Sequence, residues 1–206
     1  MWRLDHLALS CATLGEGAEA GADALGVPLE PGGQHPLMGT HNRLLSLGPD
    51  EYLEVIAINP EAPSPGRPRW FRLDGFRGAP RLTNWVARVV DLDAALAEAA
   101  PGTGRATDLA RGDFRWRMAV PDDGCLPFDD AHPALIEWQG GLKPQDRLPD
   151  TGCRLERLEI AHPDAIGLRQ AVRLVDRRIV FVPGPKALRA TISTPRSGPG
   201  GDTRAT

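Results

Sequence analysis

The stretch Leu4-Asp5-His6-Leu7-Ala8-Leu9 alternates in polarity and predicts a β-strand with a histidine on one face. A second stretch, Tyr52-Leu53-Glu54-Val55-Ile56-Ala57-Ile58, is rich in strand-forming residues and contains one glutamate. An imidazole or a carboxylate inside a strand is costly to bury unless it finds a partner. Because histidine and glutamate both bind divalent metals, two strands of one sheet could bring His6 and Glu54 to a shared ion.

The residues between these two strands predict one helix, one loop and one further strand. An Ala-rich helix covers 15–26 and ends at its terminal glycine, and a Gly- and Pro-rich loop follows at 31–39. His41–Leu47 then forms a hairpin with the strand that contains Glu54, around a Gly-Pro-Asp turn. We therefore expect a first unit over residues 1–58.

A Pro-, Gly- and Arg-rich linker is expected over 59–80, and after it the order of elements repeats over 81–141. The repeat consists of a strand, a short helix with Asp93 as its N-cap, and two more strands. These elements are expected at Leu82–Val90, Ala94–Ala100, Phe114–Val120 and Pro133–Gln139. The last of them contains Glu137 at a place that corresponds to Glu54.

A third segment, residues 153–196, predicts a strand, a helix and two more strands, and we expect it to extend the same domain. Residues 197–206 are small, polar and Gly-rich, so a disordered tail is expected there. The predicted elements of the extension are Arg154–Ala161, a helix at about 165–175, Ile179–Val182 and Leu188–Ser193.

The composition excludes several classes of partner. A formal net charge of −3 over 206 residues gives no overall field that would favour nucleic acid or an anionic membrane. The three cysteines are widely spaced and form no Cys-x-x-Cys pair, which argues against a zinc–thiolate site and favours a reducing cytoplasm. We expect no signal peptide, because the N-terminus enters a strand pattern at once, and no membrane span, because no apolar run is long enough.

Five segments in this order resemble the vicinal oxygen chelate superfamily, which includes glyoxalases and bleomycin-resistance proteins, and within it the glyoxalase-like domain branch. The resemblance covers about residues 4–196 and implies an α+β fold: paired βαβββ modules that form a cupped mixed sheet, with a C-terminal βαββ extension. The segments are Leu4–Leu9, Gly39–Leu45, Tyr52–Ala57, Ile136-Glu137-Trp138 and Leu158–Pro163.

The resemblance also implies where a metal ion would bind. In metal-using members the ligands come from the first and last strands of each module, which correspond here to His6, Glu54 and Glu137. Asn84 occupies the first-strand position of the second module, where a His or Gln is more usual. We therefore expect a divalent ion held by the one His and two Glu, with Glu54 or Glu137 also available as a catalytic base.

Strand alternation gives an internal check on this ligand set. By simple alternation, His6 shares a face with Leu4, and Asn84 shares a face with Leu82. If the two modules are pseudo-symmetric, the four site positions should all face the same cup.

Other polar residues are candidates for binding the substrate. His41 and Asn42 lie where a loop enters a strand, a place that often lines a pocket. Arg115 and Arg117 share a strand face, where they could clamp a carboxylate or a phosphate, although a solvated face is the plainer interpretation. The remaining candidates are Asn84 and Arg88, which share a face of the strand at 82–90.

Three functions remain open at this stage. The first is a metal-dependent lyase, isomerase or, less readily, dioxygenase that acts on a small oxygenated metabolite. A dioxygenase would need a second histidine in the cup, such as His41 or His162. The second is a metal-free protein that binds or sequesters a small molecule. The third is an oligomeric accessory domain whose cup is filled with apolar side chains, and a homodimer is expected by analogy only.

Overall fold

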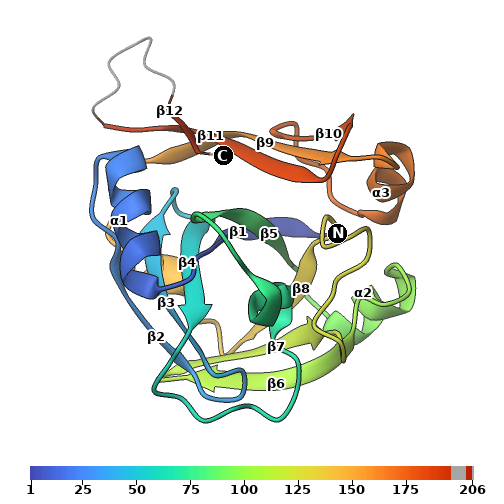
Figure 1. Cartoon of the computed structure of the whole chain (residues 1–206). Helices are drawn as coiled ribbons and strands as arrows, with labels where there is room; N and C mark the ends of the chain where they lie inside the picture. Colours follow the sequence, from blue (N-terminus) through green and yellow to red (C-terminus); the bar gives the residue numbers. More distant parts are fainter. Residues whose placement is uncertain (196–202, 206) are drawn as a thin grey trace.

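The computed structural model describes residues 1–195 and 203–205, and most of them form two β-sheets (Figure 1). The larger sheet has eight strands in the order β2-β3-β4-β1-β5-β8-β7-β6 and curls into a cup. Its strands are β1 (Arg3–Ser10), β2 (Glu30–His35), β3 (Thr40–Ser46), β4 (Tyr52–Ile58), β5 (Arg81–Arg88), β6 (Arg105–Arg111), β7 (Phe114–Val120) and β8 (Ala134–Gln139).

The two halves of this sheet have the same order of elements. The first half is β1, helix α1 (Leu14–Leu25), β2, β3 and β4, and the second is β5, helix α2 (Leu92–Glu98), β6, β7 and β8. The central strands β1 and β5 are antiparallel, and each pairs in parallel with the last strand of its own module. The expected α+β fold of paired βαβββ modules in a cupped mixed sheet is therefore confirmed.

Local sequence signals account for the helix ends. Helix α1 begins after Thr13, whose hydroxyl accepts a hydrogen bond from the Glu16 amide, and it ends at Gly26, which adopts the left-handed backbone at φ 70°. Helix α2 begins two residues earlier than expected, because Asp91, and not Asp93, accepts the capping hydrogen bond from the Ala94 amide.

Strands β2 and β6 are members of the expected βαβββ modules that the local sequence does not locate. Residues 31–39 were expected to be a loop, yet Glu30–His35 pairs with β3, and Arg105–Arg111 pairs with β7. Both are edge strands whose own sequences have little strand propensity, since β2 contains a proline and two glycines. Pairing with a strongly strand-forming neighbour therefore stabilises the strand conformation that the local sequence alone does not favour.

The C-terminal extension forms a second sheet in the order β10-β9-β11-β12, flanked by helix α3 (Ala165–Ala171). Of the tail expected at 197–206, residues 203–205 form the short strand β12, and the others lie outside the described residues. The strands of this sheet are β9 (Arg154–His162), β10 (Ile179–Pro183), β11 (Ala187–Ser193) and β12 (Thr203–Ala205).

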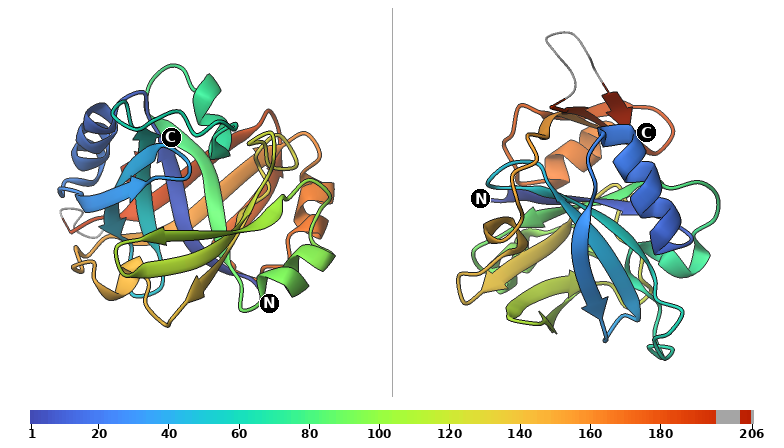
Figure 2. Two further views of the ribbon diagram at one scale, coloured as in Figure 1. Left: turned by 90° about the horizontal axis from the view of Figure 1, so that it is seen from below. Right: turned by 90° about the vertical axis from the view of Figure 1, so that its left-hand side faces the viewer.

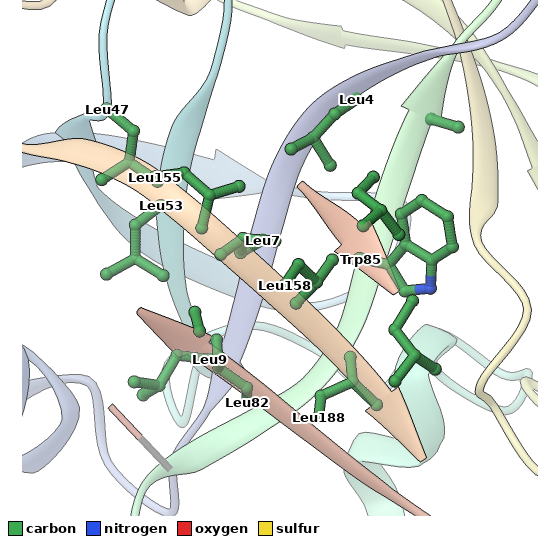
Figure 3. Close-up of a cluster of buried hydrophobic side chains, with 14 of the residues drawn as sticks. Leu4, Leu7, Leu9, Leu47, Leu53, Leu82, Trp85, Leu155, Leu158 and Leu188 are labelled. Carbon is green, nitrogen blue, oxygen red and sulfur yellow. The ribbon is translucent and has the colours of Figure 1, made fainter. Parts of the chain in front are cut away.

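The main hydrophobic core lies between the two sheets (Figure 3). Leu7 and Trp85 enter it from the large sheet, and Leu158 and Leu188 enter it from the C-terminal sheet. Leu7, Trp85 and Leu158 have no exposed surface. The extension therefore covers the outer face of β1 and β5 and leaves the inner face of the cup for a site.

Two β-bulges set the faces of the central strands. The register of β1 against β5 shifts between Leu4 and His6 and again between Ala8 and Leu9, so that Asp5 and Thr83 are the extra residues. Leu4 and Leu82 consequently point into the core between the sheets. The expectation from simple alternation, which placed Leu4 with His6 and Leu82 with Asn84, is therefore wrong.

The segment expected as a linker, residues 59–80, folds across one open end of the cup (Figure 2). It contains the 3-10 helix η1 (Trp70–Gly75), whose Trp70 and Phe71 pack with the apolar residues of the inner face. A second 3-10 helix, η2 (Pro144–Asp146), lies between β8 and the extension. Among the helices of the described residues, none combines the length and apolar character needed to cross a lipid bilayer.

The role of the extension in stability can be tested at Leu158. Leu158→Ala removes a fully buried side chain from the core between the sheets, so we expect it to lower the free energy of unfolding by about 2–5 kcal/mol. Val175→Ala is the control, because this side chain is 74% exposed and its loss should change stability by less than about 0.5 kcal/mol. Urea unfolding followed by tryptophan fluorescence measures both, and equal effects would contradict the assigned core.

Candidate functional site

A small pocket lies on the inner face of the cup. Its volume is about 30 Å³, room for one or two water molecules. Polar side chains line one part of it and aromatic rings line the rest. The lining residues are His6, His35, Asn42, Tyr52, Glu54, Trp70, Phe71, Arg111, Trp116, Met118, Ile136 and Trp138.

A chain of three buried charged side chains forms the centre of the pocket. His6 Nδ1 is 2.8 Å from Asp5 Oδ1, and His6 Nε2 is 3.5 Å from Glu54 Oε2. Asp5 can reach His6 although the two are neighbours in sequence, because Asp5 is the bulged residue of β1. Asp5 is fully buried, and its second oxygen accepts hydrogen bonds from Trp138 Nε1 and Gln145 Nε2.

The charges of this chain support one another. Burial alone would lower the pKa of His6, but the hydrogen bonds and charges of Asp5 and Glu54 outweigh it and raise that pKa to about 9. Burial alone would raise the pKa of Glu54, but His6, with help from Asn42, lowers it to about 2. At neutral pH His6 is therefore an imidazolium and Glu54 a carboxylate.

The second oxygen of Glu54 contacts a cluster of polar side chains that come from β2, β3 and β6. Asn42 Nδ2 donates to Glu54 Oε1 at 2.5 Å, and Arg111 Nη1 donates to Asn42 Oδ1 at 2.9 Å. The His35 ring lies beside them, with Nε2 3.4 Å from both Asn42 Nδ2 and Arg111 Nη1. Burial lowers the pKa of His35 to about 4, with Arg111 contributing, so His35 is neutral at neutral pH.

The aromatic side chains hold the charged chain and close the pocket. The ring of Tyr52 stacks on His6 with centroids 4.5 Å apart. Trp70 and Phe71 of η1 form one wall, and η1 is fastened by Arg72, which forms ion pairs with Asp129 and Asp130 at 3.0 and 2.6 Å. Phe71 and Arg72 both have positive φ, a strained conformation for non-glycine residues that such contacts must maintain.

The structure brings together several of the residues singled out from the sequence. His6, Glu54 and Asn42 meet in the pocket. Arg88 lies behind them, with Nη1 3.7 Å from Asp5 Oδ2. Asn84 is fully buried on the inner face beside Ala8, and neither polar atom of its side chain has a hydrogen-bond partner in the structure.

Four other predicted residues lie away from the pocket. Glu137 is on the outer face, where it accepts a hydrogen bond from the Leu92 amide at the start of α2 and pairs with Arg117. Arg117 also pairs with Asp93, and Arg115 is exposed and donates to backbone carbonyls. His41 does not line the inner pocket and lies instead at a shallow surface pocket. Glu137 therefore does not meet His6 and Glu54, contrary to the expected ligand set.

Sequence reasoning missed several residues of the pocket. Asp5 was singled out only within a strand pattern, and His35 lies in the segment 31–39 that was expected as a loop. Arg111 lies on the unpredicted strand β6, and Trp70 lies in the supposed linker. The one local signal was Asp5-His6, a carboxylate beside an imidazole in a strand, which is costly to bury unless the two pair.

The residues of the pocket fit a tightly held metal ion poorly. Counting from the bulges, His6 corresponds to Asn84, and two residues further Ala8 pairs with Glu54 while Val86 pairs with Ala134. The second module thus offers an amide and a methyl group where the first has an imidazole and a carboxylate. Among the described residues no group of three or more His, Cys, Asp or Glu side chains could hold a metal ion.

Comparison with known proteins identifies the family of the chain. The sequence model of the family described as glyoxalase-like domain matches residues 4–176. A hypothetical protein from Staphylococcus aureus has a TM-score of 0.59 at 14% identity, over 95% of this chain and 82% of its own. No curated protein matches.

A methylmalonyl-CoA epimerase from Streptomyces coelicolor, solved with 2-nitronate-propionyl-CoA, is also similar: its TM-score is 0.44 at 17% identity, over 69% of this chain and 98% of its own. The methylmalonyl-CoA epimerase of Mycobacterium tuberculosis has a TM-score of 0.39 at 23% identity, over 66% and 85%.

The charge state of His6 can be measured directly. Because Glu54 helps to raise the pKa of His6, Glu54→Gln should lower that pKa, whereas Glu137→Gln on the outer face should leave it unchanged. Nitrogen-15 NMR of the His6 ring across a pH series reports the value in each variant. A His6 that titrates at the ordinary 6.5 in the wild-type protein would contradict the buried charged chain.

The same shifts predict how stability depends on pH. The pKa of His6 is raised, so its contribution is complete below 6.5 and is lost as pH rises through about 9. The pKa of Glu54 is lowered, so its contribution is present above 4.5 and is lost as pH falls toward about 2. The combined contribution of His6 and Glu54 to the free energy of unfolding, measured by urea titration, should therefore be highest between pH 4.5 and 6.5.

Proposed function

Because the chain belongs to the glyoxalase-like domain family, within the vicinal oxygen chelate superfamily, we propose that it is an enzyme that moves a proton at a carbon next to a carbonyl group. The substrate would be a small oxygenated metabolite, and the reaction an isomerisation or a lyase-type elimination. The observation that carries this proposal is the buried pair of an imidazolium and a carboxylate, His6 and Glu54, which face each other across 3.5 Å in the inner pocket.

The two side chains have complementary roles in such a reaction. The Nε2–H of His6 donates a hydrogen bond to the carbonyl oxygen and stabilises the negative charge that develops there as an enolate forms. A carboxylate oxygen of Glu54 takes the proton from the adjacent carbon. Return of that proton to another position gives an isomer, and departure of a leaving group from the next carbon gives an elimination product.

Binding of the substrate would itself activate the base. In the free protein His6 holds the pKa of Glu54 at about 2, which makes the carboxylate a weak base. A carbonyl oxygen that accepts the hydrogen bond of His6 takes part of this interaction away from Glu54. The pKa of the buried carboxyl then rises, since burial disfavours its charge, and its basicity increases at the moment when it is needed.

Asp5 is proposed as a positioning residue. Its bond to Nδ1 fixes the orientation of the ring and leaves Nε2 as the donor that faces Glu54. The same kind of bond orients metal-binding histidines, so a divalent ion held by His6, Glu54 and water is the competing form of the proposal. We favour chemistry by the side chains, because the second module contributes no charged ligand to the pocket.

The polar content of the pocket argues against the accessory-domain hypothesis. A cup filled with apolar side chains would support such a role, yet His6, Glu54, Asn42 and Arg111 are all in the pocket. Burying charged groups lowers stability relative to apolar residues of the same size, and a function is a reason for a fold to keep them.

Hydrogen–deuterium exchange tests the proposal without a known substrate. The protein is incubated in deuterated water with a panel of small 2-oxo, 2-hydroxy and 3-oxo acids, and loss of carbon-bound protons is followed by proton NMR. For an exchanging compound, Glu54→Gln should reduce the rate by about 10²–10⁴-fold, because it removes the base. Glu137→Gln is the matched control and should retain the rate. Equal loss in both variants would exclude Glu54 as the base.

Metal content distinguishes the two forms of the proposal. Tag-free protein is incubated with Mg, Mn, Fe, Co, Ni or Zn, dialysed and analysed by mass spectrometry, beside His6→Ala and Glu54→Ala. We expect far less than one ion per chain and exchange that survives a chelator. Stoichiometric metal that is lost in both variants would instead establish the metal-dependent form. Residence in the cytoplasm and a homodimer both stay predictions.

A further inference from the structure

The edge strands β2 and β6 approach each other along a seam that the side chain of Arg111 crosses. They are the two ends of the eight-stranded sheet, and they come close at the same side of the cup (Figures 1 and 2). Arg111 of β6 reaches across the seam to Asn42 Oδ1 of β3 at 2.9 Å, beneath β2. The seam is thus closed by side-chain contacts of Arg111 in place of a backbone ladder.

Two glycines of β2 make this crossing possible. A Cβ atom at Gly33 would lie 2.6 Å from Arg111 Cδ, and a Cβ atom at Gly32 would lie 2.1 Å from Asn42 Oδ1. Any larger side chain at these positions would displace Arg111 or Asn42. The Gly-Gly pair is therefore explained by the approach of these two polar side chains, and not by a turn.

A larger pocket opens on the outer side of Arg111. Its volume is about 250 Å³, against about 30 Å³ inside, and Arg111 lines both. Phe114 forms part of its wall and is flanked by two guanidinium groups, with Arg111 Cζ 5.5 Å and Arg147 Cζ 5.0 Å from the ring centroid. The other lining residues are Glu30, Pro31, Gly32, Leu44, Pro144, Leu148 and Pro149.

The charges of this outer pocket suit an anion. Glu30 is the one carboxylate among its lining residues, against two arginines. Arg147 pairs with Asp113 at 2.8 Å, but the Asp113 side chain is 73% exposed, so exchanging this pair for a ligand costs little. Guanidinium groups bind carboxylates and phosphates with two parallel hydrogen bonds, and the Phe114 ring adds an apolar surface.

We propose that the outer pocket binds the carboxylate or phosphate group of the substrate between Arg111 and Arg147, and that movement of Arg111 admits the other end of the substrate to His6 and Glu54. This inference rests on the proposed function of the inner pair and adds a substrate class: small acids with an anionic group a short distance from the reacting carbonyl. An incoming anion compensates Arg111 for the contacts that it gives up with Asn42 and His35.

The wall formed by η1 is a poorer entrance. Helix η1 is fastened by the ion pairs of Arg72 with Asp129 and Asp130, and by a backbone hydrogen bond from the Arg72 amide to Gly124 O at 3.2 Å. Moving η1 would also expose Trp70 and Phe71, which are both buried. At the seam, Arg111 is held on its inner side by Asn42 Oδ1 and lies 3.4 Å from His35 Nε2.

Binding of small probe anions tests the outer pocket. Benzoate and inorganic phosphate are titrated into nitrogen-15-labelled protein, with benzamide as the neutral counterpart of benzoate, and amide shifts are followed by NMR. We expect benzoate or phosphate, but not benzamide, to shift Gly32, Gly33 and Leu148 with a dissociation constant of about 1–10 mM. Comparing benzoate with phosphate shows which anion the pocket prefers. Equal binding of benzoate and benzamide would overturn the proposal.

Matched arginine variants locate the binding. Arg147→Gln and Arg111→Gln should each weaken binding of the preferred anion about tenfold, since each removes a charged partner. Arg115→Gln is the control, because Arg115 is exposed on the next strand and donates to backbone carbonyls only, and its effect should be less than about twofold. Equal weakening in the Arg115 and Arg147 variants would mean unspecific attraction and would refute the site.

The same titration separates this inference from the proposed function. Glu54→Gln should reduce proton exchange by about 10²–10⁴-fold and leave binding of the anion within about twofold, because Glu54 lies in the inner pocket and not in the outer one. Anion binding in a protein without exchange activity would refute the proposed function and retain the pocket. Exchange activity without anion binding would refute the outer pocket alone.

Discussion

The buried chain of Asp5, His6 and Glu54 is the interaction on which the rest of the site depends. A protonated imidazole and two carboxylates are each costly to bury alone, and here each is held by the others. Tyr52 stacked on the ring and Trp138 bonded to Asp5 exclude water from this chain. The aromatic walls of the cup are thus the condition under which the charges keep their shifted pKa values.

The bulges of β1 and β5 show how two similar modules place different side chains in the cup. Each central strand contains one extra residue, Asp5 in one module and Thr83 in the other, immediately before the position that faces the cup. In β1 the extra residue supplies the carboxylate that pairs with His6. In β5 it supplies a hydroxyl 2.6 Å from Ser10 Oγ, beside an Asn84 whose polar atoms have no partner in the structure. Both modules therefore contain the same kind of bulge, but only the bulge in β1 contributes a residue to a charged site.

The sequence predicted the elements whose side chains alternate strongly, and it failed where tertiary contacts decide. The strands that contain His6 and Glu54 could be recognised because each alternates or is rich in strand formers. Strand β2 could not, since its glycines are selected by the approach of Arg111 and Asn42. Glu137 was misplaced because its alignment with Glu54 by motif ignores register: the strand partner of Val86 is Ala134, three residues earlier.

The small volume of the inner pocket and the polar seam beside it both bear on how a substrate reaches a buried ion pair. A buried ion pair keeps its strength only in a closed, dry space, yet a substrate has to enter that space. A wall of aromatic side chains opens at the expense of exposing apolar surface to water. Arg111 lies between the two pockets and lines both, so in the proposed arrangement the group that binds the anion also stands at the entrance to His6 and Glu54. Placing Arg111 on an edge strand, opposite a glycine pair, gives its side chain room to do both.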